Sequence, residues 1–190
     1  MEYKKAQAAM EYLLVYSWAV LAIILVFGVM FYLGVFTPSP PRFCIFQQGF
    51  SCTAYKLDVD GNLLLKFAQV PHEQITITNV ACTSRDIVLR DTVDFGSVRP
   101  ECRITNTEWT GGLRGGLILR RGEEIIITSD GTKSGRKLKC CTTNFETGEE
   151  RPVSGYLGQH YRGTIYIEYI DKDGNKRAAI GQISTTLDVP

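Results

Sequence analysis

The chain has no excess of charge of either sign. Lysine and arginine together number 21, and aspartate and glutamate number 20, which gives a formal net charge of +1 over 190 residues. Nucleic-acid binding domains concentrate basic residues on one face or along one stripe, and this balance supplies no such excess. The composition therefore gives no support for nucleic acid as a partner.

Recognisable catalytic and metal-binding motifs are also missing. The chain has two histidines, His72 and His160, and neither lies near a serine or cysteine in a known nucleophile motif. Residues 131–135 match neither the nucleophile elbow nor the phosphate-binding loop. The six cysteines lack the C-x₂-C spacing that is typical of zinc sites. We therefore expect no enzymatic activity and no cofactor or bound metal.

One motif has two interpretations. Residues 58–62 and 171–175 share the pattern D-x-D-G-N, which resembles the start of a calcium-binding EF-hand loop. The glutamate that completes such a loop is replaced by Gln69 in one copy and by Gln182 in the other. Strand-like sequence flanks both copies. The pattern favours a type I′ or bulged hairpin turn over a calcium site.

The sequence has a single long apolar run. Residues 13–36 contain no charge in 24 positions. A helix of that length extends for about 36 Å, which is enough to cross a hydrocarbon core of about 30 Å. Lys4 and Lys5 precede the run, so the positive-inside rule places the N-terminus in the cytoplasm and the rest of the chain outside. All six cysteines follow the run, which suits an oxidising compartment.

Three interpretations compete for this N-terminal segment. A cleaved secretory signal would have a shorter apolar core followed by a small-x-small cleavage site, and residues 36–41 offer none. An uncleaved anchor explains the apolar run and the two lysines. It does not explain the short polar segment of residues 4–11, KKAQAAME, which ends with a carboxylate at the edge of the membrane.

This segment resembles the class III signal peptide of archaeal type IV pilin-like proteins over roughly residues 1–36. Those leaders carry lysines and a small residue before the cleavage site, then glutamine as the first mature residue and glutamate as the fifth. The resemblance implies that a prepilin peptidase cuts between Ala6 and Gln7, and that Glu11 becomes the fifth residue of the mature chain.

Glu11 also has two interpretations. The resemblance implies that it pairs with the new α-amino group of Gln7 on a neighbouring subunit and sets the axial register of assembly. Unpaired carboxylates are costly near lipid, which agrees with a paired role. The alternative is that Glu11 lies in the interfacial zone, where the positive end of the helix dipole favours a carboxylate.

The remainder of the chain has strand patterns instead of a helical period. Alternating segments on either side of each D-x-D-G-N copy predict two hairpins, and further short apolar runs predict at least three more strands. The expected fold class is α+β, with a long hydrophobic helix followed by an antiparallel all-β sandwich, of which the immunoglobulin-like fold is one form. The expected domains are a leader (residues 1–6), a helix (7–36), a Pro-rich stalk (37–43) and an extracellular head (44–190).

The cysteines of the head suit disulfide bonds. Cys44 and Cys52 bracket a short turn-like segment, and we expect them to pair. The other four allow three pairings that the sequence leaves open. Because successive residues of a strand point to opposite faces, adjacent cysteines are expected to have different partners. These four are Cys82, Cys102, Cys140 and Cys141.

Together these features predict a structural subunit of an extracellular type IV pilus-like filament. It would span the membrane once before assembly and assemble with copies of itself or related pilins through its N-terminal helix. The resemblance further implies a role in cell adhesion or surface attachment. The alternative is a monomeric, membrane-anchored cell-surface binding protein with a β-sandwich ectodomain.

Overall fold

The computed structural model describes residues 3–34, 40–89, 92–108, 116–127, 137–144 and 146–190, with side chains described from Leu14 onward except that of Leu89. Three features of the sequence therefore lie outside the described residues: most of the expected stalk, the side chains of the expected processing and assembly residues, and residues 131–135. The chain divides into two compact units, Met1–Pro40 and Pro41–Pro190. We call the second unit the head.

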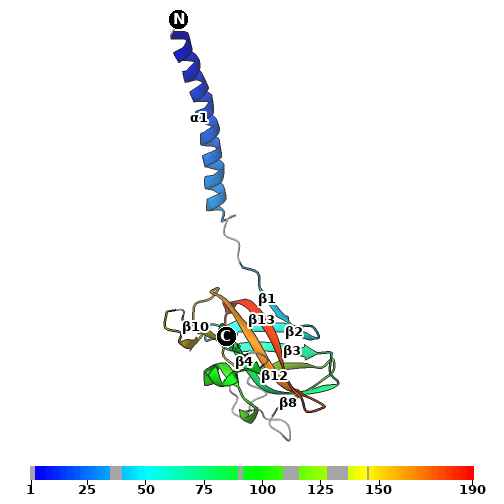
Figure 1. The fold of residues 1–190 in the computed structure, drawn as a ribbon. Coiled ribbons are helices and arrows are strands. Elements are labelled where there is room, and N and C mark those ends of the chain that lie inside the picture. The colour runs from blue at the N-terminus through cyan, green and yellow to red at the C-terminus, as the bar shows by residue number, and fades with distance from the viewer. Residues whose placement is uncertain (1–2, 35–39, 90–91, 109–115, 128–136, 145) are drawn as a thin grey trace. The chain divides into compact units, whose positions relative to one another are not determined.

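The first unit contains one long helix, α1 (Tyr3–Tyr32), drawn in blue in Figure 1. The backbone N–H groups of Leu33 and Gly34 donate to the carbonyls of Val29 and Phe31, which tightens the last turn. Gly34 has φ +68°, the left-handed conformation that commonly ends helices. The helix therefore ends four residues before the predicted end at residue 36, because a glycine cap precedes the prolines.

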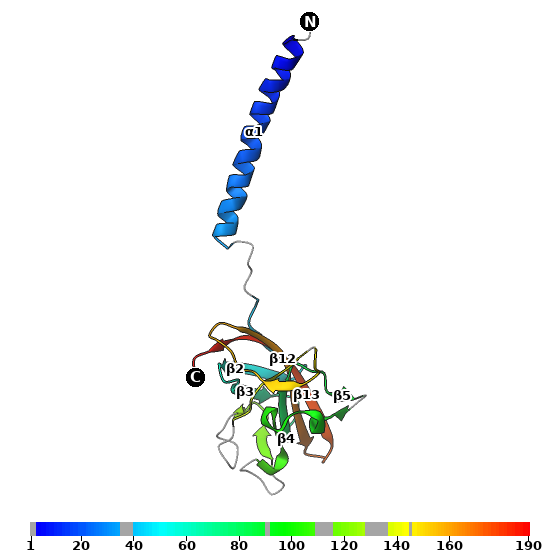
Figure 2. The ribbon, with the colours of Figure 1, turned by 90° about the vertical axis from the view of Figure 1, so that its left-hand side faces the viewer.

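The head is built mainly of strands. Its described residues form one curled, eleven-stranded sheet in the order β11-β10-β4-β12-β13-β2-β3-β9, while β1 pairs with β13, and β7 and β8 pair with β4 (Figures 1 and 2). A separate hairpin joins β5 to β6. The strands are β1 (Phe43–Phe46), β2 (Phe50–Asp58), β3 (Leu63–Gln69), β4 (Gln74–Thr83), β5 (Val88–Leu89), β6 (Thr92–Val93), β7 (Arg103–Ile104), β8 (Leu117–Arg120), β9 (Glu124–Ile127), β10 (Cys141–Thr143), β11 (Glu150–Pro152), β12 (His160–Asp171) and β13 (Lys176–Asp188).

This arrangement confirms an α+β layout with an apolar helix followed by a strand-rich head. The finer expectation of an immunoglobulin-like sandwich stays a prediction. Three short 3₁₀ helices, η1 (Phe95–Ser97), η2 (Pro100–Cys102) and η3 (Asn106–Glu108), complete the regular structure of the described residues.

Both predicted hairpins are present. β2 pairs antiparallel with β3, and β12 pairs antiparallel with β13, whose orange and red ribbons run side by side in Figure 1. The D-x-D-G-N segments form the two turns, and their glycines, Gly61 and Gly174, have φ values of +78° and +87°. A left-handed glycine closing a three-residue loop is typical of the bulged hairpin turn.

The core lies on both faces of the central strands. Along β12, Ile165 and Ile167 point into the large core, which also contains Phe67, whereas Tyr166 points into a smaller cluster. That second face is covered by the buried side chains of Ile87, Phe95, Val98 and Cys102. Residues alternate between the faces of a strand, so a strand covered on both faces is buried almost continuously. This explains why β4 and β12 carry few exposed residues.

Candidate functional site

The outer surface of α1 is the most unusual surface in the described structure. The apolar segment Leu14–Tyr32 is long and apolar enough to cross a membrane, judged by length and composition. Its 19 residues extend for about 28 Å at the helical rise, close to the thickness of a hydrocarbon core. Its large side chains are exposed, from 38% for Met30 to 90% for Tyr32. A helix that is apolar on all sides is normally covered by lipid or by other helices.

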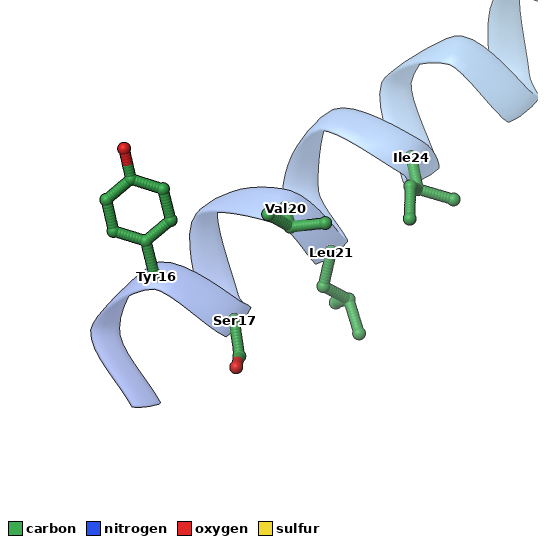
Figure 3. A pocket seen from close by; sticks show the side chains of 5 residues that line it. All are labelled: Tyr16, Ser17, Val20, Leu21 and Ile24. Carbon is green, nitrogen blue, oxygen red and sulfur yellow. The ribbon is translucent and has the colours of Figure 1, made fainter. Parts of the chain in front are cut away.

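Side chains on one face of α1 form rows along the helix, as Figure 3 shows. Tyr16, Val20 and Ile24 follow one another at intervals of four residues, and Ser17 and Leu21 form the adjacent row. Together these five residues line a shallow apolar hollow on the helix surface. Rows spaced by four residues are the ridges that fit into the grooves of a second helix. The face therefore has a geometry suited to helix packing.

Gly28 adds a second observation on the same helix. Apart from the backbone of the helix itself, a Cβ placed there would meet no atom within 4 Å. Glycine within a helix costs about 1 kcal/mol relative to alanine. No contact within the described chain therefore requires a glycine at this position. Small residues let helix backbones approach closely in a membrane, which gives a reason for Gly28 that lies outside this chain.

The predicted processing and assembly residues lie on the backbone of α1. Ala6, Gln7 and Glu11 fall within the helix Tyr3–Tyr32, but their side chains lie outside the described part of the structure. Gln7 and Glu11 are four residues apart, so they occupy the same face of the helix, one turn from each other. The helix thus runs without a break through the predicted cleavage site.

The head carries three disulfide bonds and no free cysteine. Cys44 pairs with Cys52, linking β1 to β2. Cys82 pairs with Cys140, and Cys102 pairs with Cys141, so the adjacent cysteines have different partners. The six cysteines are bonded in three pairs, so none of them is present as a thiolate that could bind zinc.

The D-x-D-G-N carboxylates are engaged within their own turns. Asp58 accepts backbone hydrogen bonds from Asp60 and Asn62 at 3.0 and 2.7 Å. Asp171 accepts the equivalent bonds, at 3.0 and 2.9 Å. The backbone N–H of Asn175 is the main reason that the pKa of Asp171 is lowered. Within the described ranges, no group of three or more histidine, cysteine or acidic residues is arranged to hold a metal ion.

The structure also brings together a histidine and a serine that no sequence motif connects. His160 Nε2 lies 3.0 Å from the hydroxyl of Ser184, and this hydroxyl donates to the carbonyl of Pro41 at 2.8 Å. Ser184 is 2% exposed. Because the Ser184 hydroxyl donates its proton to the Pro41 carbonyl, this hydrogen bond connects the first residue of the head to β13. The pair is not arranged as an activated nucleophile.

The other histidine is also held by neighbours. His72 Nε2 lies 3.3 Å from the hydroxyl of Tyr169, and its backbone N–H donates to the side chain of Gln69. Tyr169 and Gln69 are both buried. This cluster closes the end of the core beside the connection between β3 and β4.

Among the described residues, the features that bear on function are the exposed apolar helix and the surface of the disulfide-bonded head. The helix presents packing rows and an unexplained glycine, and the head has a core of its own. The chain matches no family model, no curated protein and no solved structure.

Proposed function

We propose that this chain is a structural subunit of an extracellular, type IV pilus-like filament. Before assembly α1 spans the membrane once, with the N-terminus in the cytoplasm and the head outside. A prepilin peptidase cuts between Ala6 and Gln7, and copies of the mature chain, or related pilins, then assemble through α1. The filament serves surface attachment. The head is an immunoglobulin-like β-sandwich.

The observation that carries this proposal is the exposed apolar surface of α1. Nineteen consecutive apolar or weakly polar residues are unfavourable in water, and their large side chains are exposed in the described part of the structure. Lipid can cover them before assembly, and the same surface can be covered by neighbouring copies of α1 afterwards. Heterologous contacts that do not close produce an open helical fibre. The packing rows around Val20 and the free space beside Gly28 suit such contacts.

The polar start of the helix supports assembly in preference to simple anchoring. Glu11 lies one turn after Gln7, on the same face of α1. A carboxylate in an apolar surrounding needs a partner, and the α-amino group created by cleavage on a neighbouring subunit would supply one. In a plain anchor Glu11 would have no such partner and would lie in the interfacial zone, near the positive end of the helix dipole.

The self-contained head favours a second candidate function. It has its own core and three disulfides, so it can act as an ectodomain without neighbours. A monomeric, membrane-anchored binding protein would have the same architecture. It would retain Met1 and would be released from membranes by detergent only.

The state of the protein in cells tests the proposal. We expect the N-terminal residue to be Gln7 and the chain to pellet with filaments sheared from the cell surface. Glu11→Gln should leave cleavage intact while reducing filament number. Glu2→Gln is the matched control, because the same chemical change falls in the removed leader and should have no effect on filaments. A chain that keeps Met1 and never appears in a sheared fraction would refute the filament role.

A further inference from the structure

The head displays two large apolar side chains at the tip of a tight turn. Tyr156 and Leu157 are 75% and 59% exposed. The backbone N–H of Gln159 donates to the carbonyl of Tyr156 at 3.1 Å, and Gly158 has φ +83°. This is the pattern of a type II turn, in which glycine follows the first central residue. Tight turns on a water-facing surface usually carry small polar residues instead.

The turn is fixed firmly to the head. Gly155 N–H donates to the carbonyl of Val59 at 3.1 Å, and Gly158 N–H donates to the carbonyl of Leu187 at 2.9 Å. Leu187 N–H donates in return to the carbonyl of Gln159 at 2.8 Å. The backbone groups that flank the tip are therefore already hydrogen-bonded, which lowers the cost of moving the tip out of water. Its apolar side chains project from a fixed support.

This turn lies beside the end of β13, which also contacts the first residues of the head. The carbonyl of Asp188 accepts from Val59 N–H, and the Asp188 carboxylate lies 4.0 Å from the Arg42 guanidinium. Val189, the next residue, is 61% exposed and adds to the apolar surface. Nine peptide bonds separate Tyr32 from Pro41 along the chain. Fully extended, nine peptide bonds span at most about 30 Å, which is the upper limit of this covalent tether.

We propose that Tyr156 and Leu157 form a membrane-contact tip that rests in the lipid headgroup region while α1 spans the bilayer. The inference depends on the proposed membrane insertion of α1. Tyrosine suits this region because its ring is apolar and its hydroxyl remains hydrated. The charged groups of Arg42 and Asp188 beside the tip restrict it to the headgroup level. The contact gives the unassembled subunit a second attachment, which is lost when the subunit leaves the membrane.

Tryptophan fluorescence in vesicles provides the test. The full chain is placed in phosphatidylcholine vesicles whose acyl chains are brominated near the headgroup end, because bromine quenches tryptophan on contact. In a background that lacks both native tryptophans (Trp18→Phe, Trp109→Phe), Leu157→Trp places the reporter on the tip. Val70→Trp is the matched control, because Val70 is 61% exposed and lies near Gly49, at the end of β1 away from Pro41.

Each outcome bears on a different claim. We expect the L157W emission to be shifted to the blue and quenched by brominated lipid, and the V70W emission to be neither. L157W emission that is quenched no more than V70W emission overturns the proposal. A blue shift without quenching also overturns it, because the tip would then be covered by protein. A chain that retains Trp18 and carries only Trp109→Phe reports separately on α1. If Trp18 is not quenched, the membrane insertion itself is wrong.

Discussion

The two D-x-D-G-N turns allow a prediction with an internal control. Gly61 and Gly174 occupy equivalent positions, with similar positive φ values and the same pattern of carboxylate hydrogen bonds. Their surroundings differ. A Cβ on Gly174 would meet no atom within 4 Å, whereas a Cβ on Gly61 would lie 2.3 Å from the carbonyl oxygen of Val153. Alanine is therefore expected to be tolerated in one turn and not in the other.

The expected losses follow from these contacts. The left-handed conformation costs an alanine about 1–2 kcal/mol, and Gly174→Ala should lose only this amount of unfolding free energy. Gly61→Ala must also displace the Val153 backbone. That segment is held because Val153 N–H donates to Cys140 and Cys140 N–H donates to Gly61, each at 2.8 Å. Weakening these two bonds adds roughly 1 kcal/mol each, for a total loss of about 3–4 kcal/mol.

The measurement is thermal or urea unfolding of the head, residues 41–190, monitored by circular dichroism. For a domain of this size each kcal/mol lowers Tm by about 2–4 °C, so the two variants should be well separated. Equal losses in Gly61→Ala and Gly174→Ala would show that the contact between the β2–β3 turn and Val153 does not constrain the head.

Two further predictions concern the same unfolding assay. Replacing Cys82 and Cys140 by alanine leaves the overlapping Cys102–Cys141 bond in place, so the loop that opens runs through residues 82–102 and 140–141, on the order of 20 residues, and the change should cost about 3 kcal/mol. The same change at Cys44 and Cys52 opens a loop of 8 residues and should cost about 2.5 kcal/mol. The reverse order of midpoints would contradict the pairing seen in the structure. Burial raises the pKa of Tyr161, so the folded state holds the proton of this side chain more tightly than the unfolded state does. The contribution of Tyr161 to the free energy of unfolding should therefore be constant below about pH 10 and should fall above it, as the tyrosine of the unfolded chain ionises. Tyr161→Phe should flatten this decline, and an unchanged pH profile in that variant would rule out Tyr161 as its source.

Local features of the fold could be predicted from the sequence because their partners are close along the chain. Each D-x-D-G-N turn is closed by bonds between residues at most four positions apart, such as Asp58 and Asn62. The Cys44–Cys52 bond spans 8 residues, and the structure contains this pair. The helix ends earlier than predicted because Gly34 adopts the left-handed conformation before the prolines are reached.

The remaining features depend on strand order, which no local pattern encodes. Cys82 reaches Cys140 because β4 pairs with β10 in parallel, across a separation of 58 residues. The bond from Ser184 to Pro41 spans 143 residues. The apolar tip at Leu157 was also missed, because a single exposed Tyr-Leu pair in a sequence looks the same as a buried one.

The attachment of β1 determines how the head would respond to mechanical tension. A pull on the stalk first meets the bond between Ser184 and Pro41, and then peels β1 from β13, beginning at Phe43. The Cys44–Cys52 bond lies only three residues beyond Pro41. Peeling therefore releases about 10 Å of chain before the covalent link transfers the force to β2. A head built in this way yields slightly under a sudden load and then resists further extension.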